Sequence, residues 1–366
     1  MTTYQPPAPY RPETMDLVRG DHAQRVSLTI TSGASTWTVQ PLSGRLTLSE
    51  SWAPGARLEA DLSAVFTPAE LRALDPRTKL ITATLAAGYL HATGELDDFP
   101  VATVLMDARP VRQPGAVMSL AASSEETRVI ESRWMGAEAW QQHLGVVECI
   151  ESILSYARGR AITLETDIPL RYRSDLTASV HLETGASLWS VLDDLTAAAD
   201  LRLFITEAGK WALQAKPTVA GLVSVYLSKG RGGISGDSTD TLGRDGFYDA
   251  AVVTYKWRDA GGVDRQIIGT YGTPAGKVYA TEKDFAIGQS AANAAAKTYV
   301  RALSTRGSGY VIQAVACWWL RPGHTVEITM EDDTTVRHIA QEIEFDLTAS
   351  TMTVTTREPS NLGTEP

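Results

Sequence analysis

The sequence predicts a mainly β protein of the α+β class, and two observations support this class. Apolar and polar residues alternate along short segments on both sides of the centre of the chain, which is the pattern of strands with one buried face. The centre instead carries two stretches with apolar residues at helical spacing, 145–159 and 184–201. The predicted order along the chain is therefore β, α+β, β.

The first β region is expected to follow an extended arm. Residues 1–20 carry four prolines in their first twelve positions, a composition that favours an extended chain. Alternating strands are expected at 25–51, 53–63, 79–90 and 101–113. A short helix is expected at 67–76, where Thr67 can act as the N-cap and Pro68 suits the first helical position.

The centre predicts a small α+β domain. Its first helix is expected to end at Gly159, because glycine readily adopts the backbone conformation that closes a helix. Its second helix can be capped by Thr184 or Ser187. The expected buried face of this second helix consists of Leu188, Val191, Leu192 and Leu195. Two short strands around a turn then predict a hairpin at 201–215.

The last part of the chain opens with a glycine-rich polar segment, 229–246, that is expected to be a long mobile loop. A hairpin is expected at 248–272, and an alanine-rich helix at 287–305. The apolar face of that helix is narrow, and its small side chains would let it lie close to a sheet. A strand, the turn in LRPGHTVEIT and a final hairpin at 338–359 are expected to complete the chain.

Composition and charge narrow the classes of function. The formal net charge of −10 argues against a surface that grips nucleic acid, which requires clustered Lys and Arg. No run of about 18 apolar residues occurs, so no membrane span is expected. The N-terminus lacks the order of a secretory signal, which indicates folding in a cytoplasm. Cys149 and Cys317 lie among apolar residues and are expected to be buried, without forming a disulfide or a metal site.

No catalytic, cofactor-binding or metal-binding residue is assigned from the sequence. The stretch GRGGISG at 230–236 lacks the strand and helix context of a phosphate-binding loop. The six histidines lie outside any motif for nucleophilic catalysis and are expected on the surface or in strands; they are His22, His91, His143, His181, His324 and His338.

Two further sets of residues are of types that could serve in catalysis or in ligand binding. Adjacent carboxylates are expected to be solvated, and they are Asp97 and Asp98, Asp193 and Asp194, and Asp332 and Asp333. The neighbours Trp318 and Trp319 are expected in a strand, where successive side chains point to opposite faces. One ring would then pack in a core and the other against a neighbouring domain or subunit, with a sugar-binding platform as the alternative.

The order of these segments resembles the phage tail hub family, which includes baseplate hubs and the N-terminal hub regions of siphovirus tail-associated proteins. The strings LRPGHTVEI and STMTVTTREP resemble its C-terminal part, where a turn of the form Arg/Lys-Pro-Gly-Asp precedes an alternating strand. Pro322 and Gly323 match this turn, whereas His324 replaces the aspartate. SLWSVLDDLTAAADLRLFITEAGKWALQ and SGRLTLSESWAPGARLEADLS are also similar to the family, so the resemblance covers about residues 20–360.

The resemblance implies two related β-barrel-like tube domains, 21–128 and 219–366, with an intervening small α+β domain at 129–218. The second tube domain would include the loop 229–246 and the helix 287–305. Three copies would then place six tube domains around one axis, so a homotrimer could dock onto a six-fold tail tube.

The family also implies a structural, non-enzymatic virion protein, a minor tail protein at the tail tip that is assembled in the host cytoplasm. Its expected partners are the tail tube or distal tail protein, the tape measure protein, and distal fibre or tip proteins. No cofactor is expected. DNA is expected to pass through the lumen without specific binding, and acidic residues lining that lumen would repel it. The chain ends soon after the hub segment, so no appended lytic domain is expected.

Two alternatives stay open from the sequence. A carbohydrate-binding or receptor-binding tail module would use exposed Trp and Tyr side chains and would bind glycans of the host wall. A cell-wall glycan-degrading tail enzyme would use a carboxylate pair such as Asp193 and Asp194 set across a cleft.

Overall fold

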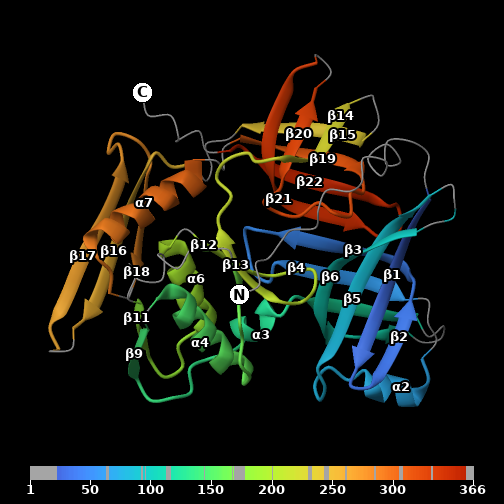
Figure 1. Ribbon diagram of the computed structural model, residues 1–366, viewed down its shortest axis with the longest axis horizontal. Helices are drawn as coiled ribbons and strands as arrows, with labels where there is room; N and C mark the ends of the chain where they lie inside the picture. The colour runs from blue at the N-terminus through green and yellow to red at the C-terminus, as the bar shows by residue number, and fades with distance from the viewer. Residues whose placement is uncertain are drawn as a thin grey trace.

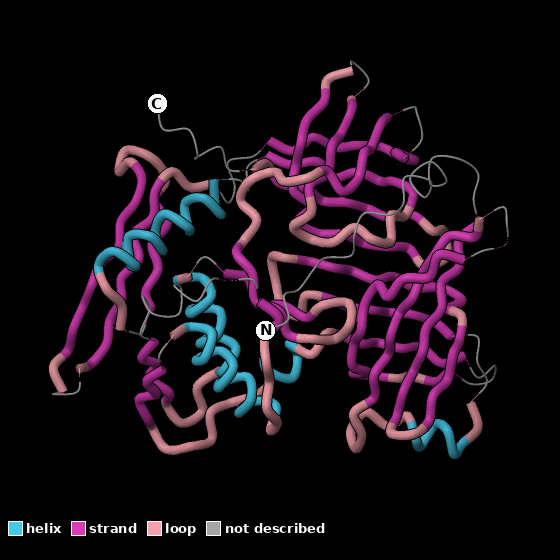
Figure 2. Tube along the Cα trace, in the orientation of Figure 1, coloured by secondary structure: helices cyan, strands magenta, loops and turns pink. Residues whose placement is uncertain are grey.

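The computed structural model describes residues 23–62, 66–91, 94, 96–112, 117–143, 145–166, 168, 178–199, 201–229, 233–242, 247–259, 262–283, 286–304, 308–330 and 333–359. The expected N-terminal arm, 1–20, lies outside these residues. In the described part, most strands belong to one 14-stranded sheet, and most helices gather on the other side of the molecule (Figures 1 and 2). The predicted class, α+β and mainly β, is confirmed.

The first β region is one antiparallel sheet with the strand order β2-β1-β5-β6-β8-β4-β3. Its strands are β1 (Ala23–Ser32), β2 (Ser35–Val39), β3 (Pro41–Ser49), β4 (Ala56–Leu62), β5 (Ile81–Leu90), β6 (Leu96–Ala108) and β8 (Val117–Ser123), and the short β7 (Val111–Arg112) pairs with β8. The alternation of apolar and polar residues in the sequence matches the alternation of buried and exposed side chains in these strands. In β4, for example, Leu58 and Leu62 are buried and Glu59 between them is exposed.

The expected short helix of this region is α2 (Pro68–Ala73). Thr67 caps it as predicted, because its Oγ1 accepts a hydrogen bond from the Glu70 backbone N at 3.3 Å. The Glu70 carboxylate in turn accepts from the Thr67 backbone N at 2.8 Å, which completes a capping box. Glu70 also accepts from Trp37 Nε1 at 3.0 Å, so the helix is tied to β2.

The second β region closes into a barrel. Its strands are β14 (Val223–Lys229), β15 (Gly233–Leu242), β19 (Ser308–Val315), β20 (Thr325–Thr329), β21 (Thr335–Asp346) and β22 (Thr351–Arg357). They follow the order β21-β20-β14-β15-β19-β22, and β22 pairs with β21 again, so the ring is complete. Closure of this kind removes the open strand edges that otherwise invite aggregation.

The expectation of a long loop at 229–246 is wrong for Gly233–Leu242, which form β15. The residues from Ser238 to Leu242 pair antiparallel with β19, a strand much later in the chain. This pairing is made by backbone groups, and the glycine-rich, polar composition gives no local sign of it. Strand formation here depends on a partner that is distant in sequence. Residues 230–232 and 243–246 lie outside the described part.

The central segment folds as a small α+β unit with its own core. It contains α3 (Glu126–Ile130), β9 (Ala139–His143), α4 (Val146–Arg158), β10 (Glu165–Thr166), β11 (Ala178–Leu182), α6 (Leu188–Ala198), β12 (Leu201–Ile205) and β13 (Trp211–Ala215). Both predicted helices and the hairpin are confirmed. Gly159 closes α4 with φ = 61°, and Ser187 caps α6 by accepting from the Ser190 backbone N at 3.4 Å.

An additional unit is inserted between β15 and β19. It consists of the sheet β17-β16-β18, with β16 (Ala250–Arg258), β17 (Asp264–Gly272) and β18 (Val278–Lys283), covered by α7 (Gln289–Ser304). The sequence placed these residues within a tube domain, 219–366. The structure gives them a separate core, and Figure 1 shows them beside the central unit, away from the barrel. The boundaries 21–128, 129–218 and 219–366 stay a prediction.

Helix α7 lies very close to the sheet beneath it, as its small side chains predict. Ala292, Ala295 and Ala296 are fully buried against β16 and β17. At Gly269 in β17, an added Cβ would lie only 2.1 Å from the backbone O of Ala292. The absence of a side chain at Gly269 is therefore what allows this helix–sheet distance. Among the described helices, none combines the length and the apolarity needed to cross a bilayer.

The substitution Gly269→Ala is expected to destabilise the inserted unit by about 1–3 kcal/mol, because the new methyl group must push α7 away from β17. The matched control is Gly221→Ala, whose Cβ would meet only Thr325 Oγ1 at 3.8 Å. Denaturant unfolding, together with hydrogen exchange of β16–β18, measures both effects. Equal stability of the two variants would contradict the close helix–sheet contact.

Candidate functional site at the domain junction

The two β regions are joined directly by hydrogen-bonded strands. Strand β3 of the first region pairs antiparallel with β21 of the second, from Arg45 opposite Asp346 to Ser49 opposite Glu342 (Figure 1). Backbone bonds continue beyond both ends of this register, from Leu347 N to Gly44 O at 3.0 Å and from Glu50 N to Gln341 O at 3.0 Å. One hydrophobic core runs through both regions.

Trp318 and Trp319 fill the core at this junction. The Trp318 ring stacks on Phe345 with centroids 4.9 Å apart, and its Nε1 donates to Gln24 Oε1 at 2.6 Å. Trp319 Nε1 donates to the backbone O of Ser224 at 2.9 Å. Each indole therefore packs in apolar surroundings while its N–H group is satisfied.

The expected strand position of this tryptophan pair is wrong. Strand β19 ends at Val315, and the following residues turn, with Leu320 N donating to Cys317 O at 2.8 Å. A turn lets two successive side chains enter one core, so Trp318 and Trp319 are both buried, at 0% and 1% exposure. The same burial argues against a sugar-binding platform at this pair, because neither ring face is open to a ligand.

Tyr89 of β5 holds this turn in place. Its Oη donates to the backbone O of Ala316 at 2.5 Å and accepts from the backbone N of Trp318 at 3.2 Å. The Tyr89 ring is fully buried and meets Trp319 edge-on, with centroids 6.1 Å apart. A side chain of the first β region thus satisfies two buried backbone groups of the second.

The turn Arg321–His324 extends the junction toward the central unit. Gly323 adopts φ = 94°, and its N donates to Ala340 O at 2.7 Å, while Ala340 N donates to His324 O at 2.8 Å. His324 Nδ1 accepts from the backbone N of Arg321 at 3.3 Å. The imidazole therefore acts as a hydrogen-bond acceptor. It occupies the turn position at which the family that this sequence resembles carries an aspartate. Burial lowers the pKa of His324 to about 4, assisted by the charges of Arg321 and Arg202.

A cavity of about 220 Å³ lies beside this turn, where the first β region, the hairpin β12–β13 and the barrel meet. We call it the junction cavity. Its walls include Val101, Thr103, Arg202, Glu207, Arg321 and His324. Arg202 reaches across from β12 and donates from Nη1 to the backbone O of Pro322 at 2.9 Å. The cavity is therefore lined by residues from all three parts of the chain.

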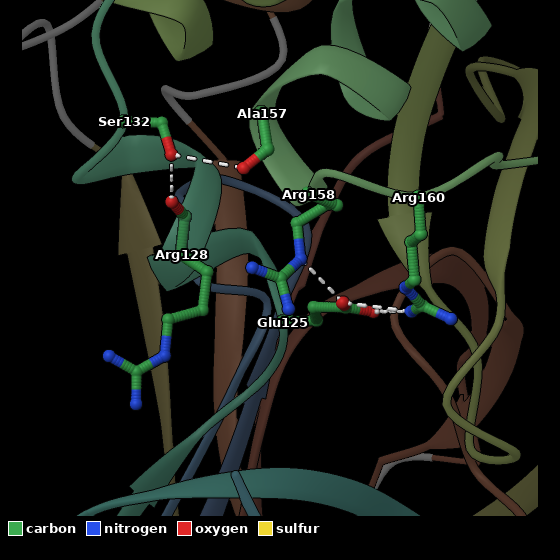
Figure 3. Close-up of polar contacts among 6 residues, drawn as sticks. All are labelled: Glu125, Arg128, Ser132, Ala157, Arg158 and Arg160. Carbon is green, nitrogen blue, oxygen red and sulfur yellow. Dashed lines mark hydrogen bonds and ion pairs between the residues drawn. The ribbon is translucent and has the colours of Figure 1, made fainter. Parts of the chain in front are cut away.

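A cluster of charged side chains, with Glu125 and Arg158 largely buried and Arg160 exposed, attaches the end of α4 to the residues after β8. Glu125 lies between Arg158 and Arg160 at the end of α4 (Figure 3). The Glu125 carboxylate accepts from Arg158 Nε at 2.6 Å and from Arg160 Nη2 at 2.9 and 3.1 Å. Ser132, just after α3, has its Oγ 2.6 Å from the backbone O of Arg128 and 3.5 Å from that of Ala157, which adds a second contact between α3 and the end of α4 (Figure 3).

The adjacent Glu126 makes a second link, to β12. Its carboxylate is almost fully buried, and Oε1 accepts from the Ile205 backbone N at 3.0 Å. Burial raises the pKa of Glu126, although hydrogen bonds and the charge of Arg202 oppose that rise. Oε2 has no hydrogen-bond partner among the described residues. A carboxyl group in this position holds the hairpin against α3.

The two carboxylates of the pair Asp193 and Asp194 differ in their exposure to solvent. Asp193 is exposed, whereas Asp194 is largely buried and forms an ion pair with Lys283 of β18. The expected solvation is therefore wrong for Asp194, because the inserted unit covers this face of α6. Burial lowers the pKa of Lys283, but the hydrogen bond that Lys283 donates to Asp194 and the neighbouring acidic groups together outweigh burial, so the pKa is raised. Asp333 lies in a turn at φ = 61°, and Asp332 and the side chains of Asp97 and Asp98 are outside the described part.

Two strand histidines and both cysteines have contacts within the protein that hold them in place. His181 of β11 contacts Glu138 at 2.8 Å, and His338 of β21 contacts Thr356 Oγ1 at 3.2 Å. Both cysteines are buried and free, as predicted, and burial raises the pKa of each thiol to about 12. Among the described residues, no group of three or more His, Cys, Asp and Glu side chains is arranged to hold a metal ion.

The sequence did not single out Tyr89, Arg321, Glu125 or Arg202. Tyr89 shares the buried alternation of β5 with Leu85 and Ala87, so its burial could have been predicted from that pattern. Its two bonds to the turn after β19 could not, because the partners lie more than 200 residues away. One local signal did point to the contacts of Glu125 and Glu126: two adjacent acidic residues directly follow a strand rich in small residues.

The fold is that of phage tail proteins. No protein-family model and no curated protein sequence match the chain. The prophage MuSo2 43 kDa tail protein from Shewanella oneidensis aligns with a TM-score of 0.62 at 9% identity, over 91% of this chain and 98% of that one. The tail protein from Neisseria meningitidis MC58 aligns with a TM-score of 0.61 at 11% identity, over 91% and 97%. Prophage tail protein gp18 from Listeria monocytogenes EGD-e aligns with a TM-score of 0.55 at 9% identity, over 92% of this chain and 96% of that one.

The variant Tyr89→Phe is expected to lower the free energy of unfolding by about 1–3 kcal/mol, since it leaves the Ala316 O and Trp318 N groups buried without this partner. Tyr226→Phe is the control, because Tyr226 is exposed on the barrel surface. Urea unfolding of both variants measures the difference. A loss no larger than that of the control would show that the Tyr89 hydroxyl does not support the junction.

Stability is expected to fall between pH 6.5 and pH 4 through His324. The unfolded chain takes up a proton near the usual pKa of about 6.5, whereas folded His324 stays neutral until about pH 4. Protonation then favours the unfolded state by up to about 3 kcal/mol. His324→Asn removes this contribution, so the stability gap between wild type and variant should shrink by that amount from pH 7 to pH 4. A gap that stays constant in urea unfolding would contradict the low pKa.

Proposed function

We propose that this chain is a structural phage tail component, a minor tail protein that forms a homotrimeric hub at the tail tip. The observation that carries the proposal is the correspondence with phage tail proteins over nearly the whole of both chains. The agreement includes the central unit and the inserted unit as well as the β regions, because more than nine-tenths of this chain is aligned. The proposed site of action is the virion, after assembly in the host cytoplasm.

The architecture supports a trimer that matches a six-fold tube. Each chain supplies two β regions fixed side by side through β3 and β21. Three chains would supply six such regions, and closed cyclic symmetry is the usual arrangement of homo-oligomers. The hub would join the tail tube or distal tail protein on one side to distal fibre or tip proteins on the other, and would contact the tape measure protein.

The buried charged groups support a structural role. Glu125 holds the central unit to the first β region, and Asp194 holds the inserted unit to the central one. Arg357 at the end of β22 contacts Glu50 and donates to the Pro217 backbone O at 2.6 Å. Each of these groups is used to position one part of the chain against another. We propose that DNA passes through the lumen of the trimer without specific binding.

Mass measurement and electron microscopy of the purified protein test this proposal. The expected result is a particle of three chains with three-fold symmetry and a six-lobed outline. Labelling of intact virions with an antibody should mark the tail tip. A monomer at micromolar concentration that neither assembles nor labels virions would overturn the hub. Affinity for host-wall glycans, or their cleavage, would instead favour the receptor-binding or glycan-degrading alternative.

A further inference from the structure

We propose that a small pocket beside the loop 49–55 holds ordered water, bound by the indole N–H group of Trp52 and the carboxyl group of Glu126. The pocket, which we call the loop pocket, measures about 100 Å³. One water molecule occupies about 30 Å³ in the liquid, so this volume admits about three waters. The walls come from the loop after β3, from α3 and α6, and from β12. The water would therefore lie between the first β region and the central unit.

Trp52 contributes a buried N–H group from the loop. The loop is closed by Ser49 N, which donates to the backbone O of Gly55 at 2.8 Å. The Arg57 guanidinium lies 4.4 Å from the centroid of the Trp52 ring and holds the ring through a cation–π contact. Among the described residues, none accepts a hydrogen bond from Trp52 Nε1. A buried indole N–H group normally has an acceptor, so this atom points to a bound ligand.

Glu126 contributes a second buried polar atom, from α3. The residue is 1% exposed, and its Oε1 accepts from the Ile205 backbone N at 3.0 Å, whereas Oε2 has no partner in the described part of the chain. Burial raises the pKa of Glu126, which favours the neutral carboxyl group. This carboxyl group lies close to the loop, since a Cβ added at Gly55 would be 3.3 Å from Oε1. Glu126 and Trp52 thus bring two unpaired atoms to one pocket from two parts of the chain.

The serine hydroxyl groups of the loop already have partners within the chain. Ser49 Oγ accepts from the backbone N of Ser51 at 3.1 Å. Ser51 Oγ accepts from Gln341 Nε2 at 2.6 Å. Within the described residues, the buried side-chain atoms of this pocket that lack a partner are Trp52 Nε1 and Glu126 Oε2. A ligand in the loop pocket is therefore expected to bind at these two atoms.

The charges around the loop pocket favour a neutral ligand. Arg202 and Lys216 bring positive charge to the lining, whereas Glu50 and Asp193 bring negative charge, so these groups leave neither sign in excess. The N–H group of Trp52 can only donate a hydrogen bond, which disfavours a cation beside it. Among neutral ligands, water fits the small volume and can both accept and donate hydrogen bonds.

Water can pair with both atoms, whichever form the Glu126 carboxyl group takes. A water oxygen accepts from the Trp52 N–H group and from a protonated Oε2. When Oε2 is ionised, the same water donates to it instead. Buried waters typically make about three hydrogen bonds to such groups, and a bridging water is nearly as favourable as a direct hydrogen bond. The bound water would thus join the loop 49–55 to α3.

NMR of the purified full chain with isotope-labelled tryptophan tests the proposal. Transfer of magnetisation from water to the indole protons is measured in NOE and ROE experiments, and Trp52→Phe assigns the resonance. Trp52 is expected to show water cross-peaks of opposite sign in the two experiments, which indicates a long-lived bound water and not proton exchange. Trp318, whose Nε1 is bonded to Gln24, should show none. The absence of such peaks at Trp52 would overturn the proposal.

A second variant tests whether the carboxyl proton of Glu126, which exchanges with solvent, is the source of the signal. Glu126→Gln keeps an acceptor for the Ile205 N–H group and has no carboxyl proton. The water cross-peaks of Trp52 are expected to persist in this variant. Their loss would assign the signal to the Glu126 proton and would overturn the water site.

Urea unfolding gives an independent measurement. Trp52→Phe removes the indole N–H group, and loss of its hydrogen bond to water is expected to raise the unfolding equilibrium constant about two- to tenfold. Trp37→Phe is the matched control, because it removes an indole N–H group that donates to Glu70 at 3.0 Å. A Trp52→Phe variant more stable than the wild type would mean that this buried N–H group has no acceptor, and the proposal would fall.

Discussion

The pairing of β3 with β21 is the contact on which the rest of the structure depends. Strand β21 belongs to the barrel through β20 and β22, and its last residues also pair with the first β region. The register is set by the alternation of buried residues, since Ile343 lies opposite Leu48 and Phe345 opposite Leu46. A slip of one residue would turn Ile343 and Phe345 out of the shared core, so this alignment is strongly specified.

The junction also explains why polar groups are buried in a protein for which we propose a structural role and no catalytic activity. Tyr89 satisfies backbone groups of the turn that carries the two tryptophans. Farther out, ion pairs attach the central and inserted units to this frame, through Glu125 with Arg158 and Asp194 with Lys283. Buried ion pairs add little net stability compared with apolar packing, but breaking one is costly. They suit contacts that must form in one arrangement only, as a hub that repeats by symmetry would require.

The local predictions from the sequence are confirmed where short-range physics decides the structure. The caps of α2 and α6, the closing glycine of α4 and the hairpin at 201–215 all depend on neighbours within a few residues. The errors share one cause. The strand β15, the burial of both tryptophans and the ion pair of Asp194 each depend on a partner far along the chain, and composition around these residues gives no sign of it.

By itself, the sequence determined the class, the order β, α+β, β, and most element positions, because periodicity and capping act over a few residues. It also indicated a likeness to tail hub proteins that the fold bears out. Only the tertiary structure decided that the two β regions share one core, that residues 250–304 leave the barrel to pack beside the central unit, and that two arginines and His324 meet at one cavity. Those outcomes depend on strand register and on contacts across hundreds of residues, which no local pattern encodes.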